Sequence, residues 1–295
     1  MANVIISSVC GLCAGCKRSI DTATLVASKN KTALFKEIVH NKNVNSMLQN
    51  LGIRTIQNLS DAKSDECVIL RAHGEPPETY KFLNEHMIKF SDCTCPNVTK
   101  IHDLVHEFSS NGYEIILIGK YGKTNGKVHP EVLGTIGWCA KQPILIEDEE
   151  DALCFKPKTG EKYYLVCQTT FNESKADKFI DIISKACSLL ECEIMLNKSI
   201  CFAQKSINTA SVELAKKSNI MIVVGGKNSS NSIELFNNVK QHCNAIFIEN
   251  IHDWKDALKK QNIQFNKDTH FGLTAGASTL KDELVELKNL IENEI

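Results

Sequence analysis

Short β-rich apolar runs alternate with helix-like stretches along the whole chain, and this alternation limits the possible folds more than any other feature. Representative strand-like runs are NVIISS, ECVILRA, YEIILIG, YYLVCQT and NIMIVVGG. Continuous apolar runs are typical of strands that are covered on both faces. Alternation with helices indicates parallel βαβ units. The sequence therefore predicts an α/β fold with small parallel sheets.

A weak internal repeat becomes visible when the polar loops are aligned by their chemistry. Cys13, Cys95 and Cys201 each precede a helical stretch with an early basic residue, and two strand-like runs follow. Each of these runs ends in a polar loop. In chain order, the loops carry His40, His73, His129, Thr169, Ser229 and Ser278. Three copies of one supersecondary unit predict a pseudo-threefold architecture.

The repeat predicts three domains with boundaries at 14–95, 96–199 and 200–295, and a strand within 1–13 is a candidate member of the third domain. Loops at the carboxyl ends of parallel strands line the ligand crevice of α/β proteins. If the three crevices face one axis, they bring together three cysteines and a ring of His, Ser, Thr and Asn side chains. We expect the functional site on this axis.

Charge and cysteine content narrow the class of protein. The 295 residues include 34 basic and 35 acidic side chains, and this balance favours neither nucleic acid nor an anionic membrane surface as partner. A secretory signal has a basic region followed by a long apolar stretch, and the first residues, MANVIISSVC, have neither. We therefore expect a cytoplasmic protein whose thirteen cysteines are mostly reduced thiols.

Three thiolates from three distant segments can hold an iron–sulfur cluster in which one iron lacks a protein ligand and acts as a Lewis acid. Histidines, hydroxyls and the backbone N–H groups of KNSSN suit a phosphate or diphosphate. Glu131 is the only carboxylate in the six loops beside such donors, and removal from water would raise its pKa. A general acid, an open iron and cluster electrons together indicate reductive removal of a hydroxyl group.

Two local motifs allow other interpretations. Cys10, Cys13 and Cys16 have the spacing of a single-loop cluster, but the following C-x3-C-P is absent, so we expect only one of the three to bind iron. HDLVH, from His102 to His106, is close to a zinc motif but has Asp103 in place of the glutamate. Two histidines one helical turn apart more often mark a solvent-exposed face, and we expect that here.

A set of segments along the chain matches one known family: GLCAGCKRSI, IVHNKNV, RAHGEPP, DCTCPNVTKIH, GKVHPEVLGTIG, CQTTF, SICFAQ, GGKNSSNS and TAGAS. Taken together, these segments resemble the LytB family of 4-hydroxy-3-methylbut-2-enyl diphosphate reductases, the terminal enzymes of the methylerythritol phosphate route to isoprenoids. The resemblance covers nearly the whole chain, in the family's order.

The resemblance implies a trefoil of three α/β domains around a central [4Fe-4S] cluster with three cysteine ligands and one open iron. The implied ligands are Cys13, Cys95 and Cys201. The implied catalytic residues are Glu131 as proton donor, Thr169 and His129. The implied substrate-binding residues are His40, His73, His129, Thr169, Ser229, Ser230, Asn231 and Ser278. The substrate would be the allylic diphosphate, the products isopentenyl and dimethylallyl diphosphates, and the electron donor ferredoxin or flavodoxin.

The chain departs from the family pattern at several positions. Cys16 replaces an aliphatic residue, and Cys10 and Cys93 add thiols near two implied ligands. The loop before His129 is several residues longer than usual, and Leu280 stands where proline is common. The extra thiols motivate an alternative function as an iron–sulfur redox sensor or electron carrier. A third interpretation is a structural or binding protein in which the same thiolates hold zinc.

Overall fold

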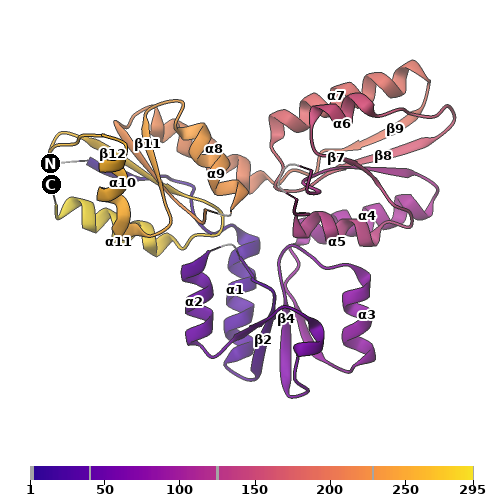
Figure 1. The fold of residues 1–295 in the computed structure, drawn as a ribbon, viewed down its shortest axis with the longest axis horizontal. Coiled ribbons are helices and arrows are strands. Elements are labelled where there is room, and N and C mark those ends of the chain that lie inside the picture. The colour runs from indigo at the N-terminus through magenta and orange to yellow at the C-terminus, as the bar shows by residue number, and fades with distance from the viewer. Residues whose placement is uncertain (1–2, 40, 124–125, 228, 295) are drawn as a thin grey trace. The chain divides into compact units, whose positions relative to one another are not determined.

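A computed structural model describes residues 3–39, 41–123, 126–227 and 229–294 (Figure 1). The chain divides into two compact units. Unit 1 comprises Met1–Ser28, Glu37–Arg54 and Phe202–Ile295, and unit 2 comprises Lys29–Lys36 and Thr55–Cys201. The three-domain division remains a prediction. Within the described residues, no helix is both long enough and apolar enough to cross a membrane.

The predicted fold class is confirmed, because the chain forms three parallel sheets of four strands each, with helices between the strands. The first sheet has the order β3-β2-β4-β5, from β2 (Lys31–Phe35), β3 (Arg54–Ile56), β4 (Glu66–Leu70) and β5 (Lys89–Asp92). The second has the order β7-β6-β8-β9, from β6 (Glu114–Ile118), β7 (Ile144–Ile146), β8 (Lys162–Cys167) and β9 (Glu193–Asn197). The third has the order β1-β12-β10-β11, from β10 (Ile220–Val224), β11 (Asn244–Ile248), β12 (His270–Ala275) and β1 (Asn3–Ile6).

All three sheets share one topology. The first strand of each set lies between the second and the third, and a fourth strand lies outside the third. In the third sheet, β1 from the start of the chain takes the fourth place, beside β12 in parallel register from Asn3–His270 to Ile6–Leu273. Figure 1 shows the indigo β1 next to β12, near both chain ends. The repeat seen in the sequence is thus a repeat of strand order, with one copy completed from the other end of the chain.

Helices connect the strands, because neighbouring parallel strands need a long crossover connection. In unit 1 they are α1 (Ala14–Ala27), α2 (Lys42–Asn50), α8 (Phe202–Ala215), α9 (Ser230–Val239), α10 (Trp254–Lys260) and α11 (Lys281–Glu292), with the short 3-10 helix η2 (Ile251–Asp253). In unit 2 they are α3 (Pro77–Glu85), α4 (Pro96–Ser110), α5 (Pro130–Trp138), α6 (Glu149–Cys154) and α7 (Glu173–Leu189), with η1 (Leu59–Asp61).

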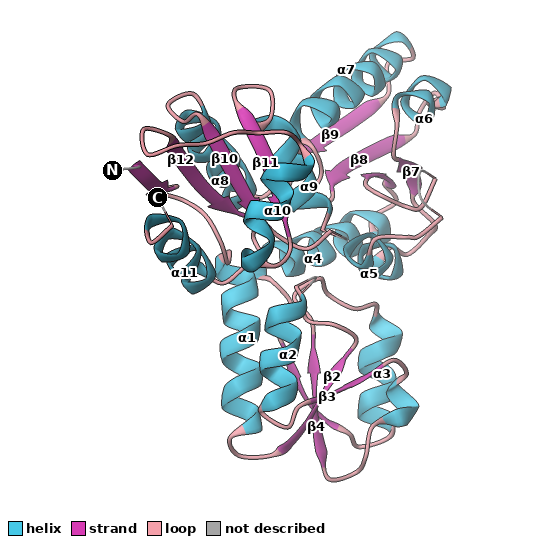
Figure 2. Ribbon diagram, turned by 60° about the vertical axis from the view of Figure 1, so that its left-hand side comes forward, coloured by secondary structure: helices cyan, strands magenta, loops and turns pink. Residues whose placement is uncertain are grey.

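Helices cover both faces of the second and third sheets, and Figure 2 shows them on either side of the magenta strands. In the third sheet, α10 and α11 pack on one face through a core that includes Trp254 and Leu287, and α8 and α9 pack on the other through Ile207 and Leu235. In the second sheet, α6 and α7 pack on one face, and α4 and α5 on the other. Burial on both faces explains the continuous apolar strands.

The repeat also fixes where the functional side chains stand. Cys95 follows β5, Cys201 follows β9 and Cys13 follows β1, so each cysteine comes after the fourth strand of a sheet. The six polar loops follow the first and third strands, which are the two central strands of each sheet. In parallel sheets these loops lie at the carboxyl edge, where α/β proteins bind their ligands. Topology therefore places both sets of predicted residues at carboxyl edges.

Candidate functional site

Glu131 lies in the first turn of α5, where its side chain is buried with 2% of its surface exposed. His129 is the N-cap residue of this helix, and Pro130 occupies the first helical position, where a missing N–H costs no hydrogen bond. Thr169, just after β8, donates to both carboxyl oxygens. Its backbone N–H reaches Oε1 at 2.5 Å and its Oγ1–H reaches Oε2 at 2.8 Å.

Burial raises the pKa of Glu131 from 4.5 to about 7, although both hydrogen bonds from Thr169 act to lower it. Burial disfavours the charged form, and the two donors compensate only in part. The sequence predicted a raised pKa for this carboxyl group, and the direction is confirmed. A carboxyl group that titrates near neutral pH can hold a proton and release it during a reaction.

His73 and His129 face each other in unit 2, and His129 precedes Glu131 by two residues. Their ring centroids are 5.5 Å apart in an edge-to-face arrangement. The backbone N–H of Glu131 donates to Nδ1 of His129 at 3.3 Å, so in this arrangement the neutral ring carries its proton on Nε2. An imidazole N–H and a carboxyl group that titrates near neutral pH can each donate to an oxyanion or a hydroxyl group.

Gln168 links the two loops of this site and was not identified from the sequence. Its Oε1 accepts from the backbone N–H of Lys120 at 3.0 Å, and its Nε2 donates to Thr170 Oγ1 at 2.6 Å. The carbonyl of Lys120 in turn accepts from the backbone N–H of His129 at 2.8 Å. The Gln168 side-chain amide therefore connects the segment before His129 to the Thr169 loop. The only signal for it in the sequence was its position next to Thr169.

Unit 2 contains two of the predicted metal ligands, Cys95 and Cys201, and the Cys201 thiol lies close to the helix that follows Cys95. Cys95 is the N-cap of α4, and the amide of Asn97, two residues later, donates to Cys201 Sγ at 3.5 Å. The backbone N–H of Cys201 donates to the carbonyl of Thr169 at 2.8 Å. The Cys201 thiol thus lies next to the first turn of α4. The backbone of Cys201 is hydrogen-bonded to Thr169, the residue that donates to Glu131.

Unit 1 carries the third predicted ligand, Cys13, which is the N-cap of α1. Its backbone N–H donates to the carbonyl of Ala277 at 3.1 Å, so Cys13 adjoins the TAGAS segment. Cys16 donates to the Cys13 sulfur through its backbone N–H at 3.4 Å. Hydrogen bonding from Cys16 lowers the pKa of the Cys13 thiol to about 6, which favours the thiolate at neutral pH.

The predicted diphosphate ligands of unit 1 occupy the loops after β10 and β12. Ser229 is the N-cap of α9 and accepts from the backbone N–H of Ser232 at 3.3 Å; Asn231 lies in the first turn of that helix. The hydroxyl oxygen of Ser278 is buried and has no hydrogen-bond partner among the described residues. A buried hydroxyl without a partner is costly unless a ligand completes it. His40 lies outside the described residues, and only the backbone of Ser230 is described.

A polar cavity lies next to these loops within unit 1, lined by the start of α2, the segment at Lys227 and the first turn of α11. Glu249 bonds to two of the segments that line the cavity: it accepts from Lys42 Nζ at 3.1 Å and from the backbone N–H of Lys227 at 3.2 Å. Glu283 accepts from the Asn43 amide at 2.7 Å. These bonds fix the segment that follows His40 to the segment that precedes Ser229.

Gln204 is a second residue that sequence reasoning missed. It lies one turn into α8, after Cys201, with 8% of its surface exposed, and neither of its amide atoms has a partner among the described residues. Asn208, one turn further on, has a buried Oδ1 without a partner. Two such polar groups at i and i+4 lie on one face of the helix. No sequence motif indicated this polar stripe.

The HDLVH prediction is wrong for His102. This residue is 3% exposed and stacks on Trp138 with ring centroids 5.6 Å apart, whereas His106 is exposed as expected. Burial lowers the pKa of His102 to about 4, so the ring is neutral at pH 7. The face of α4 that carries His102 packs against α5, and packing overrides the solvent preference of histidine.

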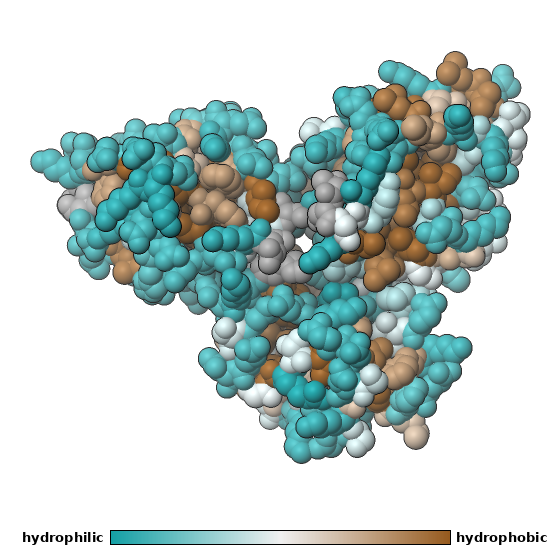
Figure 3. Space-filling model, viewed as in Figure 1, coloured by the Kyte–Doolittle hydropathy of each residue, from teal (hydrophilic) through white to brown (hydrophobic). Residues whose placement is uncertain are grey.

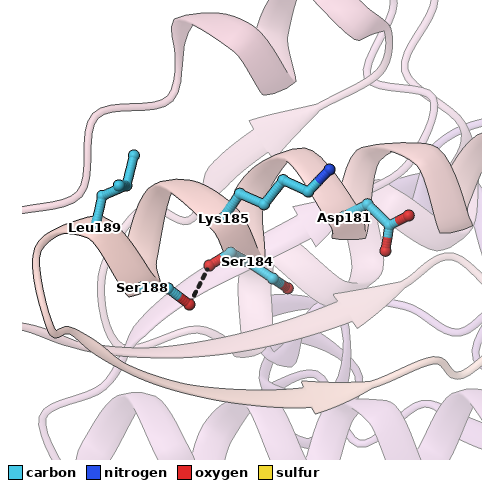
Figure 4. Close-up of a pocket in the computed structure, with 5 residues that line it drawn as sticks. All are labelled: Asp181, Ser184, Lys185, Ser188 and Leu189. Carbon is cyan, nitrogen blue, oxygen red and sulfur yellow. Dashed lines mark hydrogen bonds between the residues drawn. The ribbon is translucent and has the colours of Figure 1, made fainter.

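Other surface features lie away from the polar loops. A shallow hollow along α7 is lined by Asp181, Ser184, Lys185, Ser188 and Leu189 (Figure 4). The mainly hydrophilic surface in Figure 3 has hydrophobic patches over the part of unit 2 that carries α6 and α7, where exposed side chains include Leu153 and Leu189. Neither feature contains a predicted site residue.

The cysteines suit an iron–sulfur cluster. Each of the three predicted ligands stands at the start of a helix, where the helix dipole favours a thiolate, and all thirteen cysteines of the chain are free thiols. Soft thiolates are the ligands that such clusters require. In the described part of the chain, no three His, Cys, Asp or Glu side chains are grouped to hold one metal ion. A [4Fe-4S] cluster binds each thiolate on a different iron, so its ligands stand farther apart.

Fold and site together define an α/β protein of repeated parallel sheets, with thiols at helix starts and a buried carboxyl group at a carboxyl edge. The LytB protein family model matches residues 4–292, and the chain belongs to this family.

Relatives of known name agree with this assignment. The 4-hydroxy-3-methylbut-2-enyl diphosphate reductase of Clostridioides difficile is 34% identical over 293 residues, which cover 99% of both chains. The solved structure of the corresponding reductase from Plasmodium falciparum superposes with a TM-score of 0.85 at 27% identity, covering 99% of this chain and 88% of that one. A second solved reductase, described as the terminal enzyme of the non-mevalonate pathway, has a TM-score of 0.71 at 29% identity, and the match covers 100% of both chains.

Proposed function

We propose that this chain reduces 4-hydroxy-3-methylbut-2-enyl diphosphate to isopentenyl and dimethylallyl diphosphates, the last step of the non-mevalonate route. The reaction breaks the bond between carbon and the allylic hydroxyl oxygen. It consumes two electrons and two protons: one proton leaves with the hydroxyl as water and the other forms a new C–H bond. The carrying observation is the buried Glu131 carboxyl group, held by Thr169 and titrating near neutral pH.

A [4Fe-4S] cluster is the cofactor that we propose, with Cys13, Cys95 and Cys201 as its three ligands. Their support is their equivalent place after the fourth strand of each sheet and at the start of a helix. When bound, the cluster supplies electrons one at a time and an iron that lacks a protein ligand and acts as a Lewis acid. The lowered pKa of the Cys13 thiol favours ligation, because only the deprotonated sulfur binds iron.

The diphosphate group is proposed to bind to the imidazoles, hydroxyls and amide of the polar loops. These residues are His40, His73, His129, Ser229, Ser230, Asn231 and Ser278. The unpartnered hydroxyl of Ser278 and the start of α9 at Ser229 support this assignment, because phosphate oxygens accept from hydroxyls and from helix N-termini. His73 and His129 add ring N–H donors from unit 2.

Glu131 and Thr169 perform the proton step. In its protonated form, Glu131 holds the proton at a carboxyl oxygen, and Thr169 fixes the orientation of that group through its N–H and hydroxyl. Thr169 Oγ1 can turn toward a substrate hydroxyl and pass on a proton taken from Glu131. Burial excludes bulk water from the carboxyl group, so its proton is kept for the substrate.

The chain is proposed to act in the cytoplasm and to receive electrons from reduced ferredoxin or flavodoxin. The near balance of charges supports a partner that is neither nucleic acid nor membrane, and thirteen cysteines without a disulfide in the structure suit a reducing compartment. The relatives' names support the allylic diphosphate as substrate.

The test is turnover by anaerobically purified protein. We expect brown protein with inorganic sulfide that consumes the hydroxymethylbutenyl diphosphate when a reduced viologen dye supplies electrons. Iron and sulfide without turnover of this substrate would contradict the proposed reaction and favour a sensor or carrier. Zinc without sulfide would favour the zinc interpretation.

A pair of cysteine variants tests the ligand assignment. Cys95→Ser is expected to abolish a stable cluster, whereas Cys154→Ser, which changes an exposed thiol at the end of α6, is expected to keep wild-type iron and sulfide content. Equal cluster content in both variants would remove Cys95 from the ligand set.

A further inference from the structure

The helix α5 touches the proposed site at both of its ends. It begins with His129 and Glu131, and its last residue is Trp138. The segment Arg71–Pro76, which follows β4 and carries His73, lies against the C-terminal half of this helix. One nine-residue helix therefore has two functional groups at its start and contacts the loop of a third at its end.

Trp138 makes the polar contact between the helix and this loop. Its indole Nε1–H donates to the backbone carbonyl of Glu75 at 3.1 Å. The neighbouring Gly137 permits the close approach, because a Cβ at that position would stand 2.4 Å from Cβ of Pro76. The backbone on the C-terminal side of His73 is thus held to the end of α5.

Three aromatic rings fix the orientation of the indole. His102 stacks on it at 5.6 Å with an interplanar angle of 21°, His106 meets it edge-on at 6.2 Å, and Tyr80 lies at 6.1 Å. His102 is buried on α4 and Tyr80 lies on α3. The indole therefore cannot turn its N–H away from Glu75 without breaking contacts with two other helices.

The loop itself is closed by a buried ion pair. Arg71 Nε donates to Glu75 Oε1 at 2.6 Å, and the two side chains are 8% and 2% exposed. Gly74, with φ of +77°, completes the turn in a conformation that favours glycine. His73 therefore lies in a rigid turn, and Trp138 sets where that turn stands relative to α5.

We propose that Trp138 is a positioning residue that holds His73 at a fixed distance from His129 and Glu131. This inference rests on the proposed function, in which both histidines bind the substrate. Without the indole N–H, the Glu75 carbonyl loses its partner and the His73 turn shifts relative to α5. Glu131 is unaffected, since its bonds run from the first turn of α5 to Thr169. The defect falls on substrate binding and spares the proton step.

The test is Trp138→Phe, which removes the N–H and keeps a ring that can stack on His102. We expect KM for the hydroxymethylbutenyl diphosphate to rise about fivefold to tenfold, from the loss of one hydrogen bond, with kcat within about twofold. The pH dependence of kcat and the cluster absorption spectrum are expected to remain as in the wild type. An unchanged KM, or a fall in kcat at constant KM, would overturn the proposal.

A second variant and a control make the result independent of folding defects. Gly137→Ala displaces Pro76 without touching the indole, and it is expected to raise KM in the same way. Trp254→Phe changes the other tryptophan, in the core of unit 1, and is expected to lower Tm while KM stays unchanged. Wild-type enzyme that does not turn over the substrate rejects the proposed function, whereas active wild type with an unaltered Trp138→Phe KM rejects only the role of Trp138.

Discussion

Glu131 and a pair of aspartates, at most twenty residues apart in sequence, have opposite electrostatic surroundings within the same unit. Glu131 is buried, and its partner is the neutral Thr169. Asp148 and Asp151, at the start of α6, share the ammonium group of Lys123 at 2.9 Å each. Burial raises the pKa of Glu131 to about 7. The pKa of Asp148 is lowered, mainly by the backbone N–H of Asp151 and by Lys123.

The difference separates the chemical role proposed for Glu131 from the structural role of the aspartates. A carboxyl group deprived of water and of a cation stays protonated near neutral pH and can deliver a proton. Carboxylates that face a cation and backbone N–H groups stay charged at all physiological pH values. The aspartates at Lys123 bind the start of the long loop that precedes His129. Glu147 adds to this, because it accepts from the backbone N–H groups of Gly122 and Lys123.

The largest effect is expected at Glu131. Glu131→Gln keeps the shape and the bond from the Thr169 N–H but cannot release a proton, so kcat should fall by about a hundredfold to ten-thousandfold. Steady-state kinetics with reduced dye measures this, and iron and sulfide content should not change. Glu150→Gln, an exposed member of the Lys123 group, is the matched control and should keep kcat within about twofold. A Glu131→Gln enzyme with near-normal kcat would end the comparison.

The pH dependence of the wild type should follow the protonated form of Glu131. Because the pKa is raised to about 7, the active form dominates below that pH and declines above it. We expect kcat/KM to fall about tenfold per pH unit well above the pKa. Rates measured at constant ionic strength test this. A profile that stays flat from about pH 6 to about pH 8.5 would contradict the assignment.

Stability should respond to the same proton. The folded-state pKa of Glu131 lies above the unfolded value of 4.5, so the folded protein binds the proton more tightly. This stabilisation is fully present below about pH 4.5 and is lost as the pH rises toward about 7. Since glutamine does not titrate, Tm of Glu131→Gln should exceed that of the wild type at about pH 8, and the gap should shrink toward about pH 5.5. A gap that is constant with pH would count against burial as the cause.

The smallest effect is expected at Lys123. Lys123→Met removes the cation that Asp148, Glu150 and Asp151 share at the surface. We expect a small fall in Tm that high salt diminishes, because salt already screens such exposed pairs. The pH dependence of kcat/KM should not move. If it does, the charged group and the proposed proton donor Glu131 are coupled, and the two carboxylate environments are not independent.

Periodicity was sufficient to predict most of the fold. Apolar strands alternating with helices indicated parallel sheets, and Cys13, Cys95 and Cys201 marked a repeat that the shared strand order bears out. The sequence alone placed β1 near the third sheet only as a candidate, because pairing of the first strand with β12 spans almost the whole chain. Such non-local pairing leaves no local pattern.

Residues whose proposed role depends on contacts with the backbone could not be predicted from the sequence. Trp138 contacts a carbonyl of Glu75, and Gln168 contacts the backbone of Lys120, so neither contact depends on a motif that a reader of the sequence could match. His102 misled because its type suggests an exposed position while its helix face is packed. Glu131 could be identified from the sequence, since it lies two residues after His129 in one of the six polar loops.

The most direct measurement is the infrared band of a protonated carboxyl group, followed with pH in the wild type and in Glu131→Gln. The account predicts one such band in the wild type near pH 6 that disappears with a midpoint of about 7 and is missing from the variant. Identical spectra for the two proteins, or a midpoint near the unperturbed glutamate value of 4.5, would contradict it.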